Sequence, residues 1–172
     1  IAGHSEEATM NALQEFTAAV LHKKDGEEGV FYNESYDFFK LLEYSITELA
    51  IGDTSISEYC IVYPKRNANT EKVAAQMIAD AIAKSSGIVV KIIHDGEAEA
   101  SGTEILVGAT NRNTDSQIAD FNSKLTGIDA IVAFDGKNVN LYGLSPTALL
   151  VAANEFVAKF ADQKADKFSI SL

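Results

Sequence analysis

The sequence predicts an α/β (α+β) fold: a mixed β-sheet of about five to seven strands with helices packed on it. Two observations lead to this prediction. Short runs of apolar, often β-branched residues with the length of buried strands alternate with longer segments whose apolar residues recur at the helical period. The dipeptide Asp135-Gly136, between two such runs, is the preferred two-residue type I′ turn of a β-hairpin.

The first clear β-α-β unit begins with an apolar strand at 59–63. A helix follows with Asn69 or Thr70 as its N-cap, and Gly87 ends it at a position that favours a left-handed residue. The run 88–93 is rich in apolar, β-branched residues, which suits a strand covered on both faces. The apolar face of the helix consists of Val73, Ala74, Met77, Ile78, Ala81 and Ile82.

The next segments predict a second strand, a helix and the hairpin. A short strand is expected at 104–107, after a polar, glycine-containing stretch. Thr114 and Gln117 have the spacing of a capping box, in which each residue satisfies a free backbone N–H of the other, so a helix begins here. The strands 130–134 and 139–142 then flank the hairpin turn.

The last part of the chain predicts one more helix and one more strand. Ser145 is a good N-cap, and Pro146 occupies the first helical position, where its missing N–H costs nothing. The helix that they open is expected to run to about Ala161. Alternating apolar and polar residues at 168–172 predict a final strand.

Residues 1–45 are predicted to be the C-terminal tail of a preceding copy of the same domain plus a connector, and residues 46–172 one complete α/β domain. Aligned without a gap at an offset of 140, the beginning of the chain matches its end at Gly3/Gly143, Ser5/Ser145, Ala8/Ala148, Ala12/Ala152, Glu15/Glu155, Phe16/Phe156 and Ala18/Ala158. The matches fall on a glycine turn, a serine N-cap and one helical face. The alternative is that any two capped amphipathic helices share such residues, because alanine and glutamate are common in helices.

The connector contains the one dense aromatic cluster of the sequence, formed by Tyr32, Tyr36, Phe38 and Phe39. Exposed aromatic rings stack on sugars, so the cluster is a candidate carbohydrate surface. We interpret it instead as packing at the joint between the two copies, because aromatic side chains dominate core and interface burial.

The composition restricts the classes of partner. The net charge of −11 disfavours nucleic acid and anionic membrane surfaces, which both attract basic proteins. No apolar run approaches the ~18 residues of a membrane span. The acidic residues are scattered without the pattern of a calcium loop, which indicates solubility rather than cation binding. Cys60 is the single cysteine, lies in an apolar run, and is expected to pack as a small hydrophobe.

No catalytic, cofactor or metal motif is recognisable in the sequence. The chain has no phosphate loop, no dinucleotide-binding GxGxxG, no HExxH and no GxSxG. Its histidines, His4, His22 and His94, are far apart, and we expect structural or exposed roles for them. We therefore predict no catalytic residues, no cofactor and no metal site. Acid–base chemistry by paired carboxylates stays open, because such pairs are formed by the fold and not by spacing.

Polar residues follow two of the predicted strands. Arg66 follows the strand 59–63, and Thr110, Asn111 and Arg112 follow the strand 104–107. Ligands of open α/β sheets bind at the carboxyl ends of strands, beside helix N-termini. These four residues are therefore the predicted ligand-binding residues, for a carboxylate or an acidic sugar held by the two guanidinium groups near the helix at Thr70. The alternative is that Arg112 pairs with a nearby carboxylate and braces its loop.

Three segments together resemble a known family. They are Ile56-Ser-Glu-Tyr-Cys-Ile-Val-Tyr-Pro64, the alanine-rich helix that ends at Gly87, and Glu104-Ile-Leu-Val-Gly-Ala-Thr-Asn-Arg112. The segment 46–172 resembles the small zincin-like α/β accessory domain found beside the catalytic barrel in family 20 β-hexosaminidases, and in related secreted glycosidases and surface proteins of Gram-positive gut bacteria. The resemblance implies an extracellular, carbohydrate-associated setting and no catalytic activity of the domain itself.

We therefore expect a non-catalytic accessory module, a spacer or a binding domain, of a secreted, multi-domain, carbohydrate-associated protein. The alternative is a supporting N-terminal domain of a glycoside hydrolase whose catalytic barrel lies outside this chain. The expected partners are polysaccharide or neighbouring modules of the same chain, with no nucleic acid and no membrane insertion. The expected location is extracellular or at the cell surface.

Overall fold

The computed structural model describes residues 9–10, 13–14, 16–17, 46–66, 68–97 and 102–172. The chain divides into two compact units, Ile1–Glu43 and Tyr44–Leu172. The described residues of the first unit are helical. The predicted repeat, with its N-cap at Ser5 and its connector, falls mostly outside the described residues and stays a prediction. The aromatic cluster, Tyr32, Tyr36, Phe38 and Phe39, lies wholly outside them.

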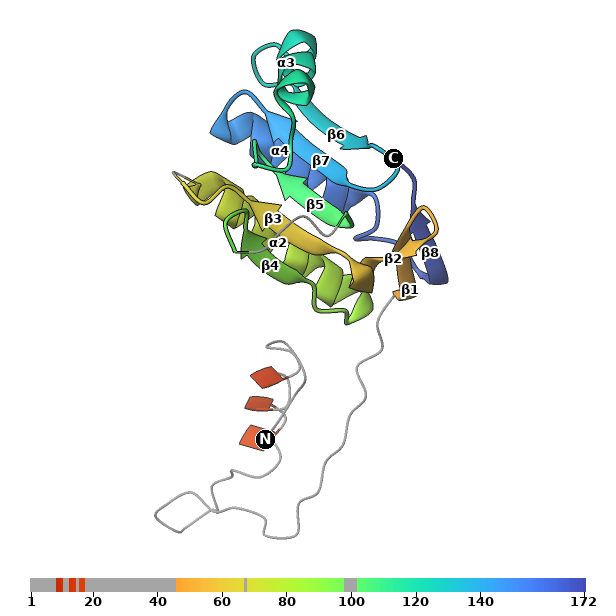
Figure 1. Ribbon diagram of the computed structural model, residues 1–172. Helices are drawn as coiled ribbons and strands as arrows, with labels where there is room; N and C mark the ends of the chain where they lie inside the picture. Colours follow the sequence, from red (N-terminus) through yellow and green to blue (C-terminus); the bar gives the residue numbers. More distant parts are fainter. Residues whose placement is uncertain (1–8, 11–12, 15, 18–45, 67, 98–101) are drawn as a thin grey trace, which may run out of the picture. The chain divides into compact units, whose positions relative to one another are not determined.

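The second unit is an α/β structure built on a five-stranded mixed sheet (Figure 1). Its order is β4-β3-β5-β7-β6, in which β3, β4, β5 and β7 are parallel and β6 is antiparallel to β7. The predicted fold class is thereby confirmed. The strands are β3 (Cys60–Tyr63), β4 (Lys91–His94), β5 (Glu104–Val107), β6 (Ala130–Phe134) and β7 (Val139–Gly143).

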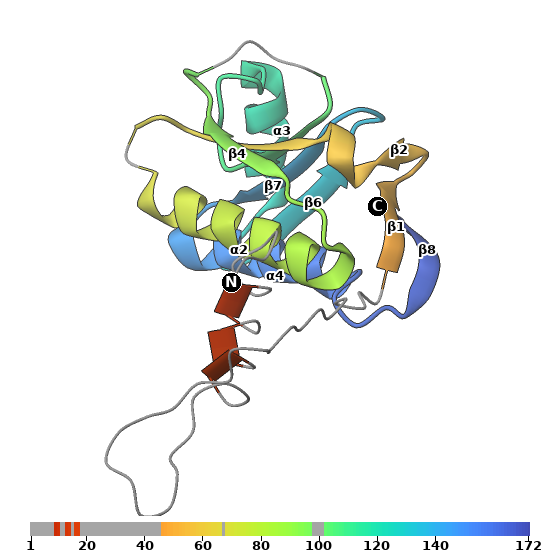
Figure 2. The same ribbon diagram turned by 90° about the horizontal axis from the view of Figure 1, so that it is seen from below.

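Helices cover both faces of this sheet. α2 (Asn69–Ser86) and α4 (Pro146–Ala158) pack together on one face, and α3 (Asp115–Lys124) lies on the other side (Figure 2). α2 connects β3 to its parallel neighbour β4, whereas α3 leads from β5 to β6, the antiparallel edge strand. The main core lies under α2 and α4 and includes Ile61, Ile78, Ile82, Ile105, Leu141 and Phe156.

A second, three-stranded sheet closes the unit. Its order is β2-β1-β8, formed by β1 (Ile46–Ile51), β2 (Thr54–Ser55) and β8 (Ala165–Ile170), and a short 3-10 turn, η1 (Ile56–Glu58), leads into β3. The sequence predicted one sheet of about five to seven strands; the described residues form two. The final strand, which follows α4, joins β1 instead of the larger sheet.

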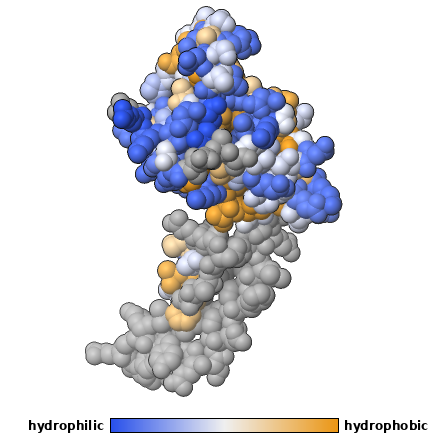
Figure 3. All heavy atoms as spheres, in the orientation of Figure 1, coloured by the Kyte–Doolittle hydropathy of each residue, from blue (hydrophilic) through white to orange (hydrophobic). Residues whose placement is uncertain are grey.

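The far face of the large sheet has a small core of its own. Val62, Ile93 and Leu106 are buried there, and the half-buried Cys60 packs against them. Cys60 therefore packs among apolar residues as expected, although it is not fully buried. The outer face of the unit drawn in Figure 3 is mostly hydrophilic, as the acidic composition leads one to expect. No helix among the described residues is long and apolar enough to cross a membrane.

The structure corrects two predicted ends of helices. The N-cap of α2 is Ala68, not Asn69 or Thr70, and no side chain caps this helix. α4 ends at Ala158 rather than near Ala161, because the chain turns from Lys159 onward. The remaining caps are as predicted: Thr114 and Gln117 form the capping box of α3, the Ser145 hydroxyl accepts the N–H of Ala148, and Gly87 is left-handed.

Two strand predictions also need correction. The strand expected at 88–93 pairs only from Lys91 to His94, because residues 88–90 are the return from α2 and reach no neighbouring strand. The hairpin is confirmed, but its tip is Gly136 and Lys137, one residue later than predicted. The side chain of Asp135 causes this shift, since its Oδ1 accepts both the Lys137 N–H (3.0 Å) and the Asn138 N–H (2.7 Å).

Candidate functional site

The carboxyl ends of β3, β4 and β5 meet at one edge of the sheet, and Asp95 joins the loops that follow them. Its Oδ1 accepts the backbone N–H of Lys65 at 3.0 Å, and its Oδ2 accepts the backbone N–H of Asn111 at 2.9 Å. Its own N–H donates to the carbonyl of Tyr63 at 2.8 Å. One carboxylate therefore fixes the loop after β3 against the loop after β5.

Arg112 is bonded to the same group of loops through its guanidinium group. Its Nε lies 3.3 Å from Oε2 of Glu104 and 3.4 Å from Oε1, and its Nη1 donates to the carbonyl of Asp95 at 3.0 Å. The side chains of Arg112 and Glu104 are 7% and 1% exposed, so this ion pair is buried. Removing one member of a buried pair leaves an uncompensated charge, which is strongly destabilising. We call Lys65, Asp95, Glu104, Asn111 and Arg112 the loop clasp.

Thr110 and Asn113 connect the loop clasp to the middle of the sheet. Oδ1 of Asn113 accepts both the N–H and the hydroxyl of Thr110 at 3.0 Å, and the Thr110 hydroxyl accepts the N–H of Arg112 at 3.2 Å. Nδ2 of Asn113 donates to Oδ1 of Asn140, a buried residue of β7, at 2.8 Å. These bonds give the loop after β5 one defined conformation.

The four predicted ligand-binding residues are therefore in different situations. Thr110, Asn111 and Arg112 lie together, as expected, and bond to protein groups. Arg66 is exposed, and it has no hydrogen bond or ion pair with any other described residue. The pairing of Arg112 with Glu104 is the alternative given above, a brace for the loop. Ligand binding by these residues stays a prediction, and the ion pair favours the structural role.

Lys65 joins the loop clasp through its backbone N–H alone, and the two carboxylates of the clasp, Asp95 and Glu104, were missed in the sequence. Asp95 opens the segment 95–103, which reads as a polar loop, and Glu104 reads as the first residue of a strand. A usable signal existed for Asp95: it directly follows an apolar strand and precedes a glycine, at the carboxyl edge where polar groups gather. The sequence contains no feature that predicts the buried ion pair of Glu104. Its burial depends on the loop that places Arg112 against it, and that contact is made only in the folded chain.

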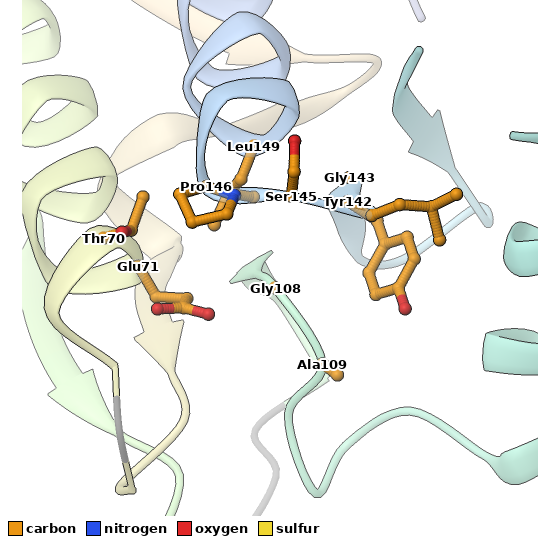
Figure 4. Close-up of a pocket in the computed structure, with 10 residues that line it drawn as sticks. Thr70, Glu71, Gly108, Ala109, Tyr142, Gly143, Ser145, Pro146 and Leu149 are labelled. Atoms are coloured by element: carbon orange, nitrogen blue, oxygen red, sulfur yellow. The ribbon is translucent and has the colours of Figure 1, made fainter. Parts of the chain in front are cut away.

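A pocket of about 260 Å³ lies at the same edge, at the carboxyl ends of β5 and β7. It lies between the first turn of α2, which contributes Thr70 and Glu71, and the start of α4 (Figure 4). The residues that line it are Thr70, Glu71, Gly108, Ala109, Tyr142, Gly143, Leu144, Ser145, Pro146 and Leu149.

Two glycines allow the backbone to approach the helices so closely. Gly108 has φ +80°, and a Cβ on it would lie 2.8 Å from Cγ of Glu71. A Cβ on Gly143 would lie 2.6 Å from the backbone N of Leu149. Figure 4 shows the Glu71 side chain reaching toward Gly108. The strand ends and helix starts around the pocket are thus in direct contact.

The pocket has a different electrostatic character from the predicted anion site. Glu71 is the one charged residue among the described residues that line it, and its half-buried carboxylate has no hydrogen bond or ion pair within the described part of the chain. In the first turn of α2, the carboxylate interacts favourably with the helix dipole. A free carboxylate accepts hydrogen bonds from hydroxyl or ammonium groups and repels anions, so this pocket does not suit an acidic sugar.

Comparisons with known proteins give distant structural similarities. No protein-family model matches the sequence, and no curated protein matches it. One similar solved structure is a GH138 enzyme targeting pectin rhamnogalacturonan II, with 11% identity and a TM-score of 0.39 over 64% of this chain. Another is CpGH84D, with 12% identity and a TM-score of 0.43 over 78% of this chain.

Both of these structures are glycoside hydrolase chains, and this chain spans 11% and 22% of their lengths. Similarity at this level assigns neither a family nor an activity.

Proposed function

We propose that this chain is a non-catalytic accessory module, a spacer or a binding domain, of a secreted, multi-domain, carbohydrate-associated protein. The carbohydrate setting follows from the resemblance of the segment 46–172 to the accessory domain of family 20 β-hexosaminidases. The pairing of polar groups in the loop clasp supports the absence of catalysis.

The observation that supports this proposal is the mutual pairing of polar groups at the carboxyl edge of the large sheet. A general acid or base needs a lone pair or proton that it can exchange with a substrate. Both carboxylate oxygens of Asp95 accept backbone N–H groups, and Glu104 is buried against Arg112. Their bonds position loops, as expected of a structural module.

The pocket beside the loop clasp supports the same proposal. Hydrolysis of a glycosidic bond by the common mechanism uses two carboxyl groups, one on each side of the bond. Glu71 is the one carboxylate among the described residues that line the pocket. The hydroxyls of Tyr142 and Ser145 in the pocket already bond to Asn122 and to the N–H of Ala148. The Glu71 carboxylate is therefore the group best suited to hold a hydroxyl of a neutral ligand.

The alternative is that this unit supports a glycoside hydrolase barrel elsewhere in a longer protein. The paired polar groups of the loop clasp fit this alternative equally well, since a supporting domain is also expected to keep its polar groups paired. The sequence of the full-length gene separates the two: a (β/α)8 barrel after Leu172 favours the supporting domain, and further repeats or an anchor favour the accessory module.

The test of the proposal is an activity assay on the purified chain with aryl-glycosides, ester substrates and peptides, with and without a chelator. We expect turnover no faster than that of the buffer blank. Glu71→Gln and Glu155→Gln are the matched variants, because Glu155 is exposed on α4 away from the pocket lining. Hydrolysis that Glu71→Gln abolishes and Glu155→Gln retains would make the chain an enzyme and overturn the proposal.

A further inference from the structure

We propose that the unit Tyr44–Leu172 is a force-resisting module, in which tension along the chain loads the β1–β8 strand pair in shear. The inference rests on the proposed function in one respect: tension reaches the unit when it is a spacer between other parts of a chain. The structural observation is the parallel pairing of the first and last strands of the unit.

The direction of the two strands determines how the pair is loaded. β1 and β8 are parallel, with a register that runs from Ile46↔Ala165 to Ile51↔Ile170. The chain therefore enters the pair at one end, at Ile46, and leaves it at the other, after Ile170. Pulling on the two chain ends slides the strands along each other, so the ladder hydrogen bonds are loaded together and not one after another.

Side-chain bonds across the pair oppose this sliding. The Thr47 hydroxyl donates to the carbonyl of Asp166, and the Ser169 hydroxyl donates to the carbonyl of Gly52 at 2.6 Å. Lys167 and Glu48 form an ion pair at 2.7 Å, which adds little because both side chains are exposed. These contacts lie along the whole length of the pair, from Thr47 to Gly52.

Packing also anchors both strands in the main core. Ile46, Leu49 and Ile51 of β1 and Ile170 of β8 are at most 1% exposed. They belong to the same apolar cluster as α2, α4 and the large sheet. Sliding β1 along β8 would pull these buried side chains out of the positions in which they pack in the core. The barrier to sliding therefore includes the cost of exposing these apolar side chains to water as well as the cost of breaking the hydrogen bonds between the strands.

The topology shields the rest of the unit. Residues 52–164, which include the loop clasp and the pocket, lie between β1 and β8 along the chain. Tension that enters at β1 and leaves at β8 reaches these residues only after the pair has parted. A spacer of this kind keeps any binding surface on its large sheet intact under load.

The experiment is single-molecule force spectroscopy on the full chain in two pulling geometries. In the first, handles are attached at the N- and C-termini; in the second, at Asp53→Cys and the C-terminus, with Cys60→Ala in both. Asp53 follows β1 and is exposed, so the second geometry pulls both strands from the same end and peels them apart. We expect the force that unfolds the unit to be at least about twofold higher in the first geometry.

Variants test the pair itself. Thr47→Val with Ser169→Ala should lower the unfolding force in the first geometry, whereas Thr126→Val, which removes a hydroxyl bond to Asp129 far from the pair in sequence, should leave it unchanged. Equal forces in the two geometries, or an equal effect of both variants, would overturn the inference. Such a result would contradict the mechanical role but not the proposed function. Glycoside turnover in the activity assay would contradict the proposed function, and it would not change the unfolding forces.

Discussion

The loop clasp and the pocket lie at the same edge of the same sheet, yet their polar groups are used in opposite ways. In the loop clasp, Asp95 and Glu104 accept hydrogen bonds from backbone N–H groups and from Arg112, respectively. In the pocket, Glu71 has no such partner among the described residues. The difference shows that the carboxyl end of a parallel sheet is not by itself a functional site. Residues that bond from one loop to another, such as Asp95, can give it a purely structural role.

The largest effect is expected from Arg112→Ala. This change leaves the buried carboxylate of Glu104 without its cation and should lower the free energy of unfolding by about 3–5 kcal/mol. Urea unfolding followed by circular dichroism measures it. The double variant Arg112→Met/Glu104→Leu, which replaces the pair by apolar groups, should recover most of the loss. A loss below about 1 kcal/mol in the single variant would mean that the pair is not a brace.

A smaller effect is expected from Gly108→Ala, which tests how tightly the pocket is built. Alanine at φ +80°, with a Cβ 2.8 Å from Cγ of Glu71, should lower the free energy of unfolding by about 2–4 kcal/mol. Gly127→Ala is the control, because Gly127 also has positive φ (+57°) and nothing within 4 Å of the added Cβ. Equal losses of unfolding free energy for the two variants would show that the Glu71 side chain can move away at little cost, and that the contact between Gly108 and Glu71 is not tightly packed.

Asp95→Ala should have an effect of about 1–3 kcal/mol, since the backbone N–H groups of Lys65 and Asn111 lose their acceptor but gain access to water. The loss should appear first in those loops. Chemical shift changes measured by NMR should therefore be concentrated at residues 64–66 and 110–112. Changes spread evenly over α3 and α4 would contradict a local clasp.

The smallest effect is expected from Glu71→Gln. The carboxylate has no described partner to lose, so only its interaction with the α2 dipole is removed, about 0.3–1 kcal/mol. The same urea unfolding experiment measures it beside Glu155→Gln. A loss as large as that of Arg112→Ala would mean that Glu71 belongs to a structural network and would remove the contrast between the two regions.

Local signals predicted the fold well because each acts over a few residues. The capping box at Thr114, the N-cap at Ser145 and the glycine at 87 formed as expected. The predicted N-cap of α2, Asn69 or Thr70, was wrong. The N-cap is Ala68, which has no capping side chain and therefore does not mark the start of the helix in the sequence. The split into two sheets was not predicted, because it depends on pairing between strands far apart in the sequence, such as β1 with β8, which no local pattern encodes.

The candidate site was predicted in part for the same reason. Thr110, Asn111 and Arg112 were found because polar residues after a buried strand have a fixed place in an α/β sheet. Their partners were not found, since Asp95 and Glu104 reach them through contacts between separate loops. The pocket was missed because its boundaries are two glycines and two helix starts, and glycine has no side chain to suggest a site.

The measurement that tests the contrast most directly is native-state amide hydrogen exchange of the unchanged protein. The backbone N–H groups of Lys65 and Asn111 donate to Asp95, so we predict that they exchange slowly, at rates set by opening of the clasp. The N–H groups of Asn69 and Thr70, in the uncapped first turn of α2, should exchange fast. Fast exchange at Lys65 and Asn111, equal to that at Asn69 and Thr70, would show that the edge is mobile and contradict a structural role for the loop clasp.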